Sequence, residues 1–205
     1  MSTPGGIIYV VDDEAGMRKA LTRLLRADGF DVRAFASAQD FLAAHRAEET
    51  ACLVLDVAMP GLDGIELQRR LTHAGALVPI VFLTGTGDIP MSVRAIKAGA
   101  VDFLTKPVND ADLLRAVRAA LALAASSKIE HAEQAALAER LATLTPRERE
   151  VMAHVVAGQL NKQIAGDLGT SEQNIKIHRG RVMEKMGVES LADLVRAAER
   201  LGIGK

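Results

Sequence analysis

Five times within its first 123 residues the chain alternates a short apolar run with an amphipathic stretch, and this alternation limits the folds open to it. The first run, Ile7 to Val11, is rich in β-branched residues and nearly continuous, as in a strand buried on both faces. Apolar residues at helical spacing follow, from Met17 to Leu25. Repetition of this unit predicts an α/β domain over residues 1–123, with a doubly wound five-stranded parallel sheet covered by helices.

The rest of the sequence has a helical pattern. Residues 110–141 contain neither Pro nor Gly and are rich in Ala. They predict a long helix, with residues 124–142 as a helical linker. A weak coiled coil is an alternative, and Ser126-Ser127 could be a break, because Ser is a mediocre helix former. The start signal Thr145-Pro146-Arg147-Glu148 opens the first of four helices expected in a small all-α domain, residues 143–205. Two of these helices, joined by Gly169-Thr170, form a helix-turn-helix pattern.

The composition favours a protein of the cytoplasm. Cys52 is the only cysteine, which rules out a disulfide within the chain, and we expect it to be a small core residue. No apolar run approaches the roughly 20 residues needed to cross a bilayer. No basic cluster precedes an apolar stretch at the N-terminus, as it would in an export signal. We therefore expect a cytoplasmic protein with no membrane partner.

The formal net charge of −1 hides a difference between the two ends of the chain. Residues 1–123 carry 13 Lys or Arg against 15 Asp or Glu, whereas residues 143–205 carry 10 against 8. The small excess of positive charge thus lies with the helix-turn-helix pattern. It permits double-stranded DNA as a partner without requiring it.

Acidic residues follow two of the expected strands. Asp12 and Asp13 come after the first strand, and Asp56 comes after the third. Ligands of parallel sheets bind at the carboxyl ends of the strands, so we expect these three carboxylates to converge there. Three close carboxylates repel one another, and a hard cation with oxygen ligands relieves that repulsion. The sequence therefore predicts a Mg²⁺ site.

The remaining strand ends offer donors. Thr84 ends the fourth strand and supplies a hydroxyl, and Lys106 follows the fifth and supplies an ammonium. Together they could hold the oxygens of a phosphoryl group on Asp56. The metal ion and the ammonium of Lys106 would neutralise negative charge while the phosphoryl group is transferred. Each of these residues is a weak signal alone, but their order, each at the end of its own strand, is hard to obtain by chance.

Residues 7–123 resemble the receiver domain of bacterial two-component response regulators, which has a flavodoxin-like fold. The motifs that carry the resemblance are Val10-Val11-Asp12-Asp13-Glu14, Leu55-Asp56-Val57-Ala58-Met59-Pro60-Gly61, Leu83-Thr84-Gly85 and Phe103-Leu104-Thr105-Lys106-Pro107. The resemblance implies that a sensor histidine kinase phosphorylates Asp56. It also implies that Mg²⁺ is bound by the side chains of Asp12, Asp13 and Asp56 and by the backbone carbonyl of Ala58.

The resemblance further assigns the residues around the phosphoacceptor. Thr84 and Lys106 would contact the phosphoryl group, Phe103 would be the switch aromatic, and the Lys106-Pro107 bond would be cis. Ala58 and Thr86 stand where larger or more polar side chains are common. Because both would flank the phosphoryl group, they bear on the lifetime of the phosphorylated state.

Residues 143–203 resemble the NarL/FixJ, or LuxR-type, DNA-binding domain. The motifs are the eight residues from Leu144 to Val151, the eight from Gly158 to Ala165, and the helix from Ser171 to Met186. The likeness implies base-edge contacts from Lys176, Ile177 and Arg179, and phosphate contacts from Lys162, Thr170, Ser171 and Lys185. Gly180 departs from the pattern, because many members carry a polar side chain there.

Across the whole chain the match is closest to FixJ-like members. Phosphorylation of Asp56 would then reshape a face that includes Val93 and Lys97, produce a homodimer, and bring two helix-turn-helix units onto DNA half-sites. RNA polymerase is a further candidate partner. Two alternatives are an aspartyl-phosphate phosphohydrolase and a regulator gated by a ligand or partner without phosphate. Ala58 argues against the first, because such an enzyme needs a carboxylate two residues after its nucleophile.

Overall fold

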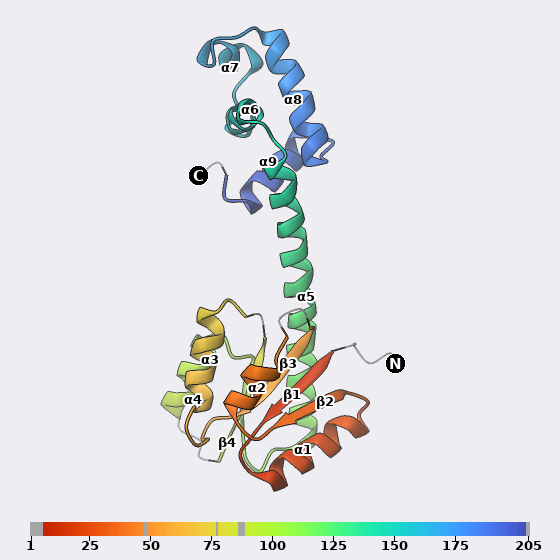
Figure 1. Ribbon diagram of the computed structural model, residues 1–205, viewed down its shortest axis with the longest axis vertical. Helices are drawn as coiled ribbons and strands as arrows, with labels where there is room; N and C mark the ends of the chain where they lie inside the picture. Colours follow the sequence, from red (N-terminus) through yellow and green to blue (C-terminus); the bar gives the residue numbers. More distant parts are fainter. Residues whose placement is uncertain (1–5, 47–48, 77, 86–88, 204–205) are drawn as a thin grey trace. The chain divides into compact units, whose positions relative to one another are not determined.

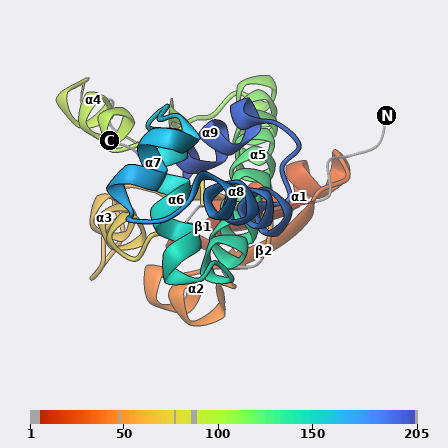
Figure 2. The same cartoon turned by 90° about the horizontal axis from the view of Figure 1, so that it is seen from above.

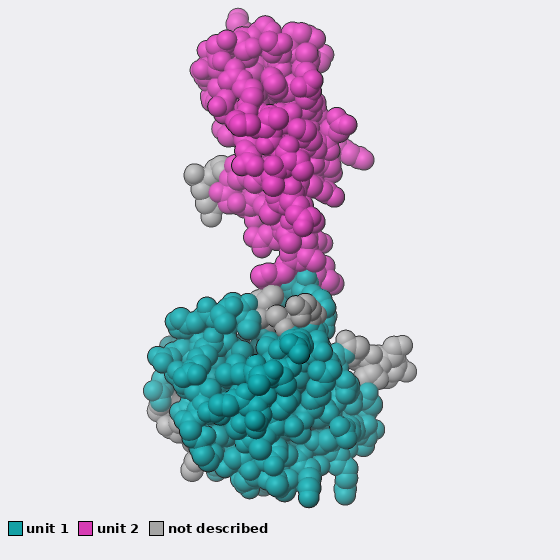
Figure 3. Space-filling view, viewed as in Figure 1, with its two compact units in different colours: residues 1–128 teal, residues 129–205 magenta. Residues whose placement is uncertain are grey.

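The computed structural model describes residues 6–46, 49–76, 78–85 and 89–203. The chain divides into two compact units, residues 1–128 and 129–205 (Figure 3). Thr86, at which a departure from the receiver pattern was noted, lies outside the described residues. In the described part of the chain, no helix is both long enough and apolar enough to span a membrane.

Unit 1 is built on a five-stranded parallel sheet with strand order β2-β1-β3-β4-β5 (Figure 1). Parallel neighbours need crossover connections, and helices supply them here. The strands are β1 (Ile7–Val11), β2 (Asp31–Phe35), β3 (Ala51–Asp56), β4 (Ile80–Thr84) and β5 (Asp102–Thr105). The helices are α1 (Ala15–Ala27), α2 (Ala38–Ala44), α3 (Gly64–His73), α4 (Ile89–Lys97) and α5 (Asp110–Ala142). The predicted flavodoxin-like fold is confirmed.

Helices cover both faces of the sheet, as the continuous apolar strands predicted. On one face, Tyr9, Leu53 and Phe82 pack with residues of α2, α3 and α4. On the other, Ile8 and Val54 pack with residues of α1 and of the first part of α5. Successive strand residues alternate between the two cores because the side-chain period of a strand is two.

Cys52 lies on β3 within the second of these cores and is fully buried. Burial disfavours the thiolate and raises the pKa of the thiol to about 12. A thiol of that pKa is poorly reactive, as expected for a small core residue.

Unit 2 is entirely helical over its described residues. It contains the end of α5 together with α6 (Pro146–Val156), α7 (Asn161–Asp167), α8 (Glu172–Met186) and α9 (Leu191–Arg200). Its core includes Val151, Ile164, Ile175 and Leu194, and α8 lies against both α6 and α7 (Figure 2). The four helices expected after residue 143 are thus present.

Helix α5 runs without interruption through both units, including Ser126 and Ser127. Its last turns belong to the core of unit 2, since Leu137 and Leu141 pack there. Arg140 donates a hydrogen bond of 3.1 Å to the carbonyl of Met186, at the end of α8. The division into residues 1–123, 124–142 and 143–205 stays a prediction.

Candidate functional site

The acidic residues meet at the carboxyl edge of the sheet in unit 1. Asp12 directly follows β1 and Asp56 is the last residue of β3, and both are buried. Parallel pairing of Val11 with Leu55 brings the two strand ends side by side. Asp13 is exposed, and oxygen atoms of Asp12, Asp13 and Asp56 lie within 4.8 Å of one another. The structure therefore brings the three predicted carboxylates together.

Lys106 extends from the end of β5 into this acidic cluster. Its Nζ lies 2.8 Å from Oδ2 of Asp12 and 3.0 Å from Oδ2 of Asp56. Burial opposes the charge of the ammonium, but hydrogen bonds to the two carboxylates outweigh this effect and raise the pKa of Lys106. Lys106 is therefore a fixed positive charge at the site.

The site nevertheless retains an excess of negative charge. Glu14 also approaches Lys106, with its Oε1 3.8 Å from Nζ. Lys106 thus faces three carboxylates, and that of Asp13 lies close to two of them. Carboxylate oxygens are the ligands that Mg²⁺ prefers, and the exposed Asp13 leaves the cluster open to an ion that keeps several waters. The donor set fits a magnesium ion held by Asp12, Asp13 and Asp56.

Three further predicted residues lie in or just after strands β3, β4 and β5. Thr84 ends β4 and is buried, and its carbonyl accepts a 2.7 Å hydrogen bond from the backbone N–H of Lys106. Phe103, on β5, is half-buried and its ring centroid lies 5.9 Å from that of Phe82. Ala58 is exposed in the loop after β3, where its N–H donates to Oδ1 of Asp56 at 3.4 Å. The Lys106-Pro107 bond is cis, as implied by the resemblance.

Gly64 helps to set the position of Asp56. An added Cβ at this first residue of α3 would lie 2.4 Å from the carbonyl oxygen of Asp56. The N–H of Gly64 also donates to the carbonyl of Val57 at 3.0 Å. Only glycine permits this approach of the helix to the strand end. Sequence reasoning missed this residue, and the turn-forming residues from Pro60 to Gly64 are the signal that could have indicated it.

The helix-turn-helix of unit 2 is formed by α7 and α8. Gly169, in the turn, has a φ of 61°, a backbone conformation that favours glycine. Ser171 caps α8 by accepting a hydrogen bond from the N–H of Asn174, and the hydroxyl of Thr170 accepts one from the Asn174 side chain at 3.1 Å. The two predicted phosphate contacts at this turn therefore also hold the start of α8.

The predicted base-reading residues lie on the exposed side of α8. Lys176 and Ile177 are exposed, and Ile177 retains 45% of its accessible surface. Arg179 is half-buried, and its guanidinium donates to the side-chain oxygen of Asn161 at 3.2 Å. Lys162 is exposed on α7. All four side chains start from elements that the core of unit 2 holds in place.

Lys185 differs from these residues, because its ammonium is directed to the protein itself. Its Nζ lies 2.6 Å from Oε2 of Glu148, which is 2% exposed, and 3.2 Å from the carbonyl of Thr143. Hydrogen bonds from Lys185 and from the backbone of Thr145 lower the pKa of Glu148 to about 2. Lys185 thus already has a structural partner, and a phosphate would have to compete with it.

On α4, the two residues predicted for dimerisation are both exposed. Val93 retains 45% of its accessible surface, as does Ile96 beside it, and Lys97 ends the helix. Exposed apolar side chains next to a charged one are compatible with a docking face. The pairing itself stays a prediction.

Comparison with known proteins decides the family. Residues 8–118 match the family described as "Response regulator receiver domain", and residues 142–198 match "Bacterial regulatory proteins, luxR family". The chain belongs to the two-component response regulators. Because its receiver is joined to a LuxR-type DNA-binding domain, it is a DNA-binding transcriptional regulator, which is not an enzymatic class.

Relatives match this response regulator over nearly its full length. It is 48% identical over 197 residues to Nodulation protein W of Bradyrhizobium diazoefficiens, covering 96% of this chain and 87% of the relative. It is 45% identical over 201 residues to the transcriptional regulatory protein FixJ of the same organism, covering 98% of each. The structure of the response regulator StyR matches with a TM-score of 0.82 and 46% identity, covering 95% and 98% of the two chains.

Proposed function

We propose that Asp56 of this response regulator is phosphorylated by a sensor histidine kinase, and that the modification drives dimerisation and operator binding. The observation that carries the proposal is the convergence of Asp12, Asp13 and Lys106 on a buried, strand-terminal aspartate. A structural aspartate would not need a second and a third carboxylate within 4.8 Å.

In the transfer, a carboxylate oxygen of Asp56 attacks the phosphorus of a phosphohistidine. The new P–O bond replaces the P–N bond, and the imidazole leaves and takes up a proton. Mg²⁺ held by Asp12, Asp13, Asp56 and the carbonyl of Ala58 would neutralise charge on the phosphoryl oxygens. Lys106 already contacts Asp56 and can donate to one of these oxygens, and the hydroxyl of Thr84 can donate to another.

The response of the receiver would follow from the new hydrogen bonds. If Thr84 turns toward the phosphoryl group, the half-buried Phe103 beside it can turn further inward. Strand β5, which carries Phe103, lies against α4, and β4, which ends at Thr84, pairs with β5. A changed α4 face, with Val93 and Lys97, would then pair with a second copy of the chain. RNA polymerase remains a candidate partner of the DNA-bound dimer.

In unit 2, we propose that Lys176, Ile177 and Arg179 read base edges in the major groove. Lys162, Thr170 and Ser171 would contact phosphates. Lys185 is the weakest member of this set, because its ammonium is bound to Glu148. A dimer would place two α8 helices on half-sites about one helical turn of DNA apart.

The test uses the full chain with acetyl phosphate and Mg²⁺, with Asp56→Asn and the control Asp31→Asn, an exposed residue of β2. We expect phosphorylation, seen by intact mass, in the unaltered chain and in the control but not in Asp56→Asn. Light scattering should show dimers in the same two samples, and selection from genomic DNA fragments should enrich a near-palindrome. Full dimerisation of Asp56→Asn would place the switch elsewhere, and steady turnover of small phosphomonoesters would favour the phosphohydrolase alternative.

A further inference from the structure

Arg18, in the first turns of α1, hydrogen-bonds to the backbone of the acidic turn rather than to a side chain. Its NH1 donates to the carbonyl of Asp12 at 2.7 Å and to the carbonyl of Asp13 at 2.8 Å. Both distances are those of strong, charge-assisted hydrogen bonds. A single nitrogen therefore binds two consecutive peptide groups.

These two peptide groups flank the Cα of Asp13. Because each peptide unit is planar, the orientations of the two units on either side of a Cα set the direction of its Cβ. Asp12 has additional restraints, since its Oδ1 accepts the N–H of Glu14 and its Oδ2 binds Lys106. The exposed side chain of Asp13 makes no hydrogen bond within the described part of the chain. Its direction depends on the backbone that Arg18 holds.

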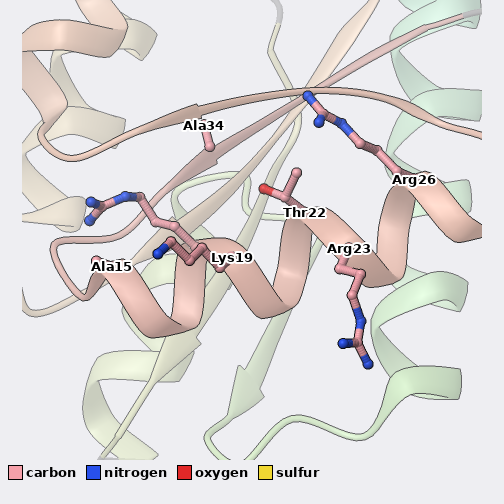
Figure 4. A pocket seen from close by; sticks show the side chains of 7 residues that line it. Ala15, Lys19, Thr22, Arg23, Arg26 and Ala34 are labelled. Atoms are coloured by element: carbon pink, nitrogen blue, oxygen red, sulfur yellow. The ribbon is translucent and has the colours of Figure 1, made fainter.

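Stability of the helix does not explain a cation at this place. The N-terminal end of a helix carries partial positive charge, which disfavours a nearby cation. The first turn of α1 contains no acidic side chain, so the carboxylates that attract Arg18 are those of Asp12, Asp13 and Glu14, which directly precede the helix. Lys19 and Arg23 add further positive charge along the helix, where they line a groove with Ala34 of β2 (Figure 4).

We propose that Arg18 is a positioning residue that directs the Asp13 carboxylate toward Asp12 and Asp56, and so sets the affinity of the site for Mg²⁺. This inference deepens the proposed function and rests on its magnesium site. Arg18 itself would not contact the ion, because its guanidinium donates to backbone carbonyls. Residues that orient metal ligands typically change affinity by about 10- to 100-fold when they are removed.

The sign of the effect separates positioning from simple electrostatics. Loss of a nearby positive charge alone should strengthen binding of a cation. Loss of the two carbonyl contacts should weaken it, because Asp13 would no longer be directed to the site. Arg18→Gln removes both, whereas Arg23→Gln removes only a charge from the same helix (Figure 4).

The experiment titrates Mg²⁺ into the unphosphorylated full chain by isothermal calorimetry. We expect about tenfold weaker binding in Arg18→Gln, unchanged or slightly tighter binding in Arg23→Gln, and partial recovery in Arg18→Lys, whose ammonium keeps the charge and several donors. Amide exchange of the β1 peptides reports whether each variant is folded. Binding in Arg18→Gln as tight as in the unaltered chain would overturn the proposal.

A second measurement distinguishes this inference from the proposed function. The initial rate of acetyl-phosphate labelling is followed against Mg²⁺ concentration for the unaltered chain and Arg18→Gln. A positioning role predicts a higher Mg²⁺ requirement with an unchanged maximal rate, and a lowered maximal rate at an unchanged Mg²⁺ requirement contradicts it. If the unaltered chain binds Mg²⁺ but is never labelled, the proposed function fails while the calorimetric result on Arg18 stands.

Discussion

Each unit of this response regulator contains a buried acidic side chain paired with a lysine, but the two pairs differ in charge balance. In unit 2, Glu148 meets Lys185 at 2.6 Å and also accepts the N–H of Thr145 at 2.9 Å. In unit 1, Lys106 faces Asp12, Asp56 and Glu14, with Asp13 close by. The first pair is a balanced structural contact. The second is left with surplus negative charge, which is the condition that the proposed binding of Mg²⁺ requires.

The largest loss of stability is expected when either of the two lysines is replaced. Without Mg²⁺, Lys106→Met should cost unit 1 about 3 kcal/mol, because two buried carboxylates lose their cationic partner. Saturating Mg²⁺ should restore part of this loss by supplying positive charge. Urea unfolding, followed by amide exchange of β1 and β3 peptides with and without Mg²⁺, measures both effects.

The matched control for that experiment is Lys185→Met in unit 2. Its loss should appear in peptides of α6 and α8 and should not respond to Mg²⁺. Equal rescue of both variants by Mg²⁺ would show that the difference between the two sites is not one of charge balance.

A second prediction concerns the carboxylate of the balanced pair. Glu148→Gln should destabilise unit 2 by about 2 kcal/mol, because the hydrogen bonds that the charged carboxylate accepts from Lys185 and from the backbone N–H of Thr145 are weakened. Urea unfolding at neutral pH, followed in unit 2 peptides, is the measurement. No change in stability would mean that the Glu148–Lys185 pair contributes little to the stability of unit 2. Lys185 could then leave Glu148 and bind a DNA phosphate at little cost.

The same kind of substitution should have the opposite sign in unit 1. Asp13→Asn removes one of the crowded carboxylates and should stabilise unit 1 by about 1 kcal/mol in the absence of Mg²⁺. Added Mg²⁺ should reduce or reverse this advantage, because the unaltered chain gains stability by binding the ion. Thermal unfolding across a Mg²⁺ titration tests this prediction, and a destabilised variant without Mg²⁺ would contradict it.

The last prediction concerns the stability of unit 2 in acid and expects no effect at neutral pH. The pKa of Glu148 is lowered from 4.5 to about 2, so its contribution is complete above pH 4.5 and is lost as the pH falls toward about 2. The unfolding free energy of unit 2 should therefore decline over this range more steeply in the unaltered chain than in Glu148→Gln. Parallel acid titrations of both proteins measure the difference, and superimposable curves would show that Glu148 has no lowered pKa.

Much of unit 1 was predictable because its signals are local in the sequence. The apolar runs at β1 and β3 identified strands buried on both faces, and the parallel sheet that follows places their ends together. Asp12, Asp56 and Lys106 therefore met as expected. The role of Arg18 was not predicted, because its acceptors are backbone carbonyls, which every residue carries.

Lys185 shows the opposite case. The family likeness implied a phosphate contact for Lys185, which stays a prediction, and the structure adds that Glu148, 37 residues away in the sequence, binds its ammonium. Glu148 itself was recognised only as part of a helix start signal, a role it also fills through its hydrogen bond to Thr145. No local sequence pattern predicts an ion pair between a residue of α6 and a residue of α8.

The sequence by itself determined the order and type of the elements and the residues that follow each strand, because hydrophobic period and chain order are properties of the chain. Only the tertiary structure decided which charges are neutralised and which remain. Lys106 is shared among several acids, whereas Lys185 has one buried partner. The physical reason is that charge balance depends on distances between side chains from different elements, and those distances exist only after the elements have packed.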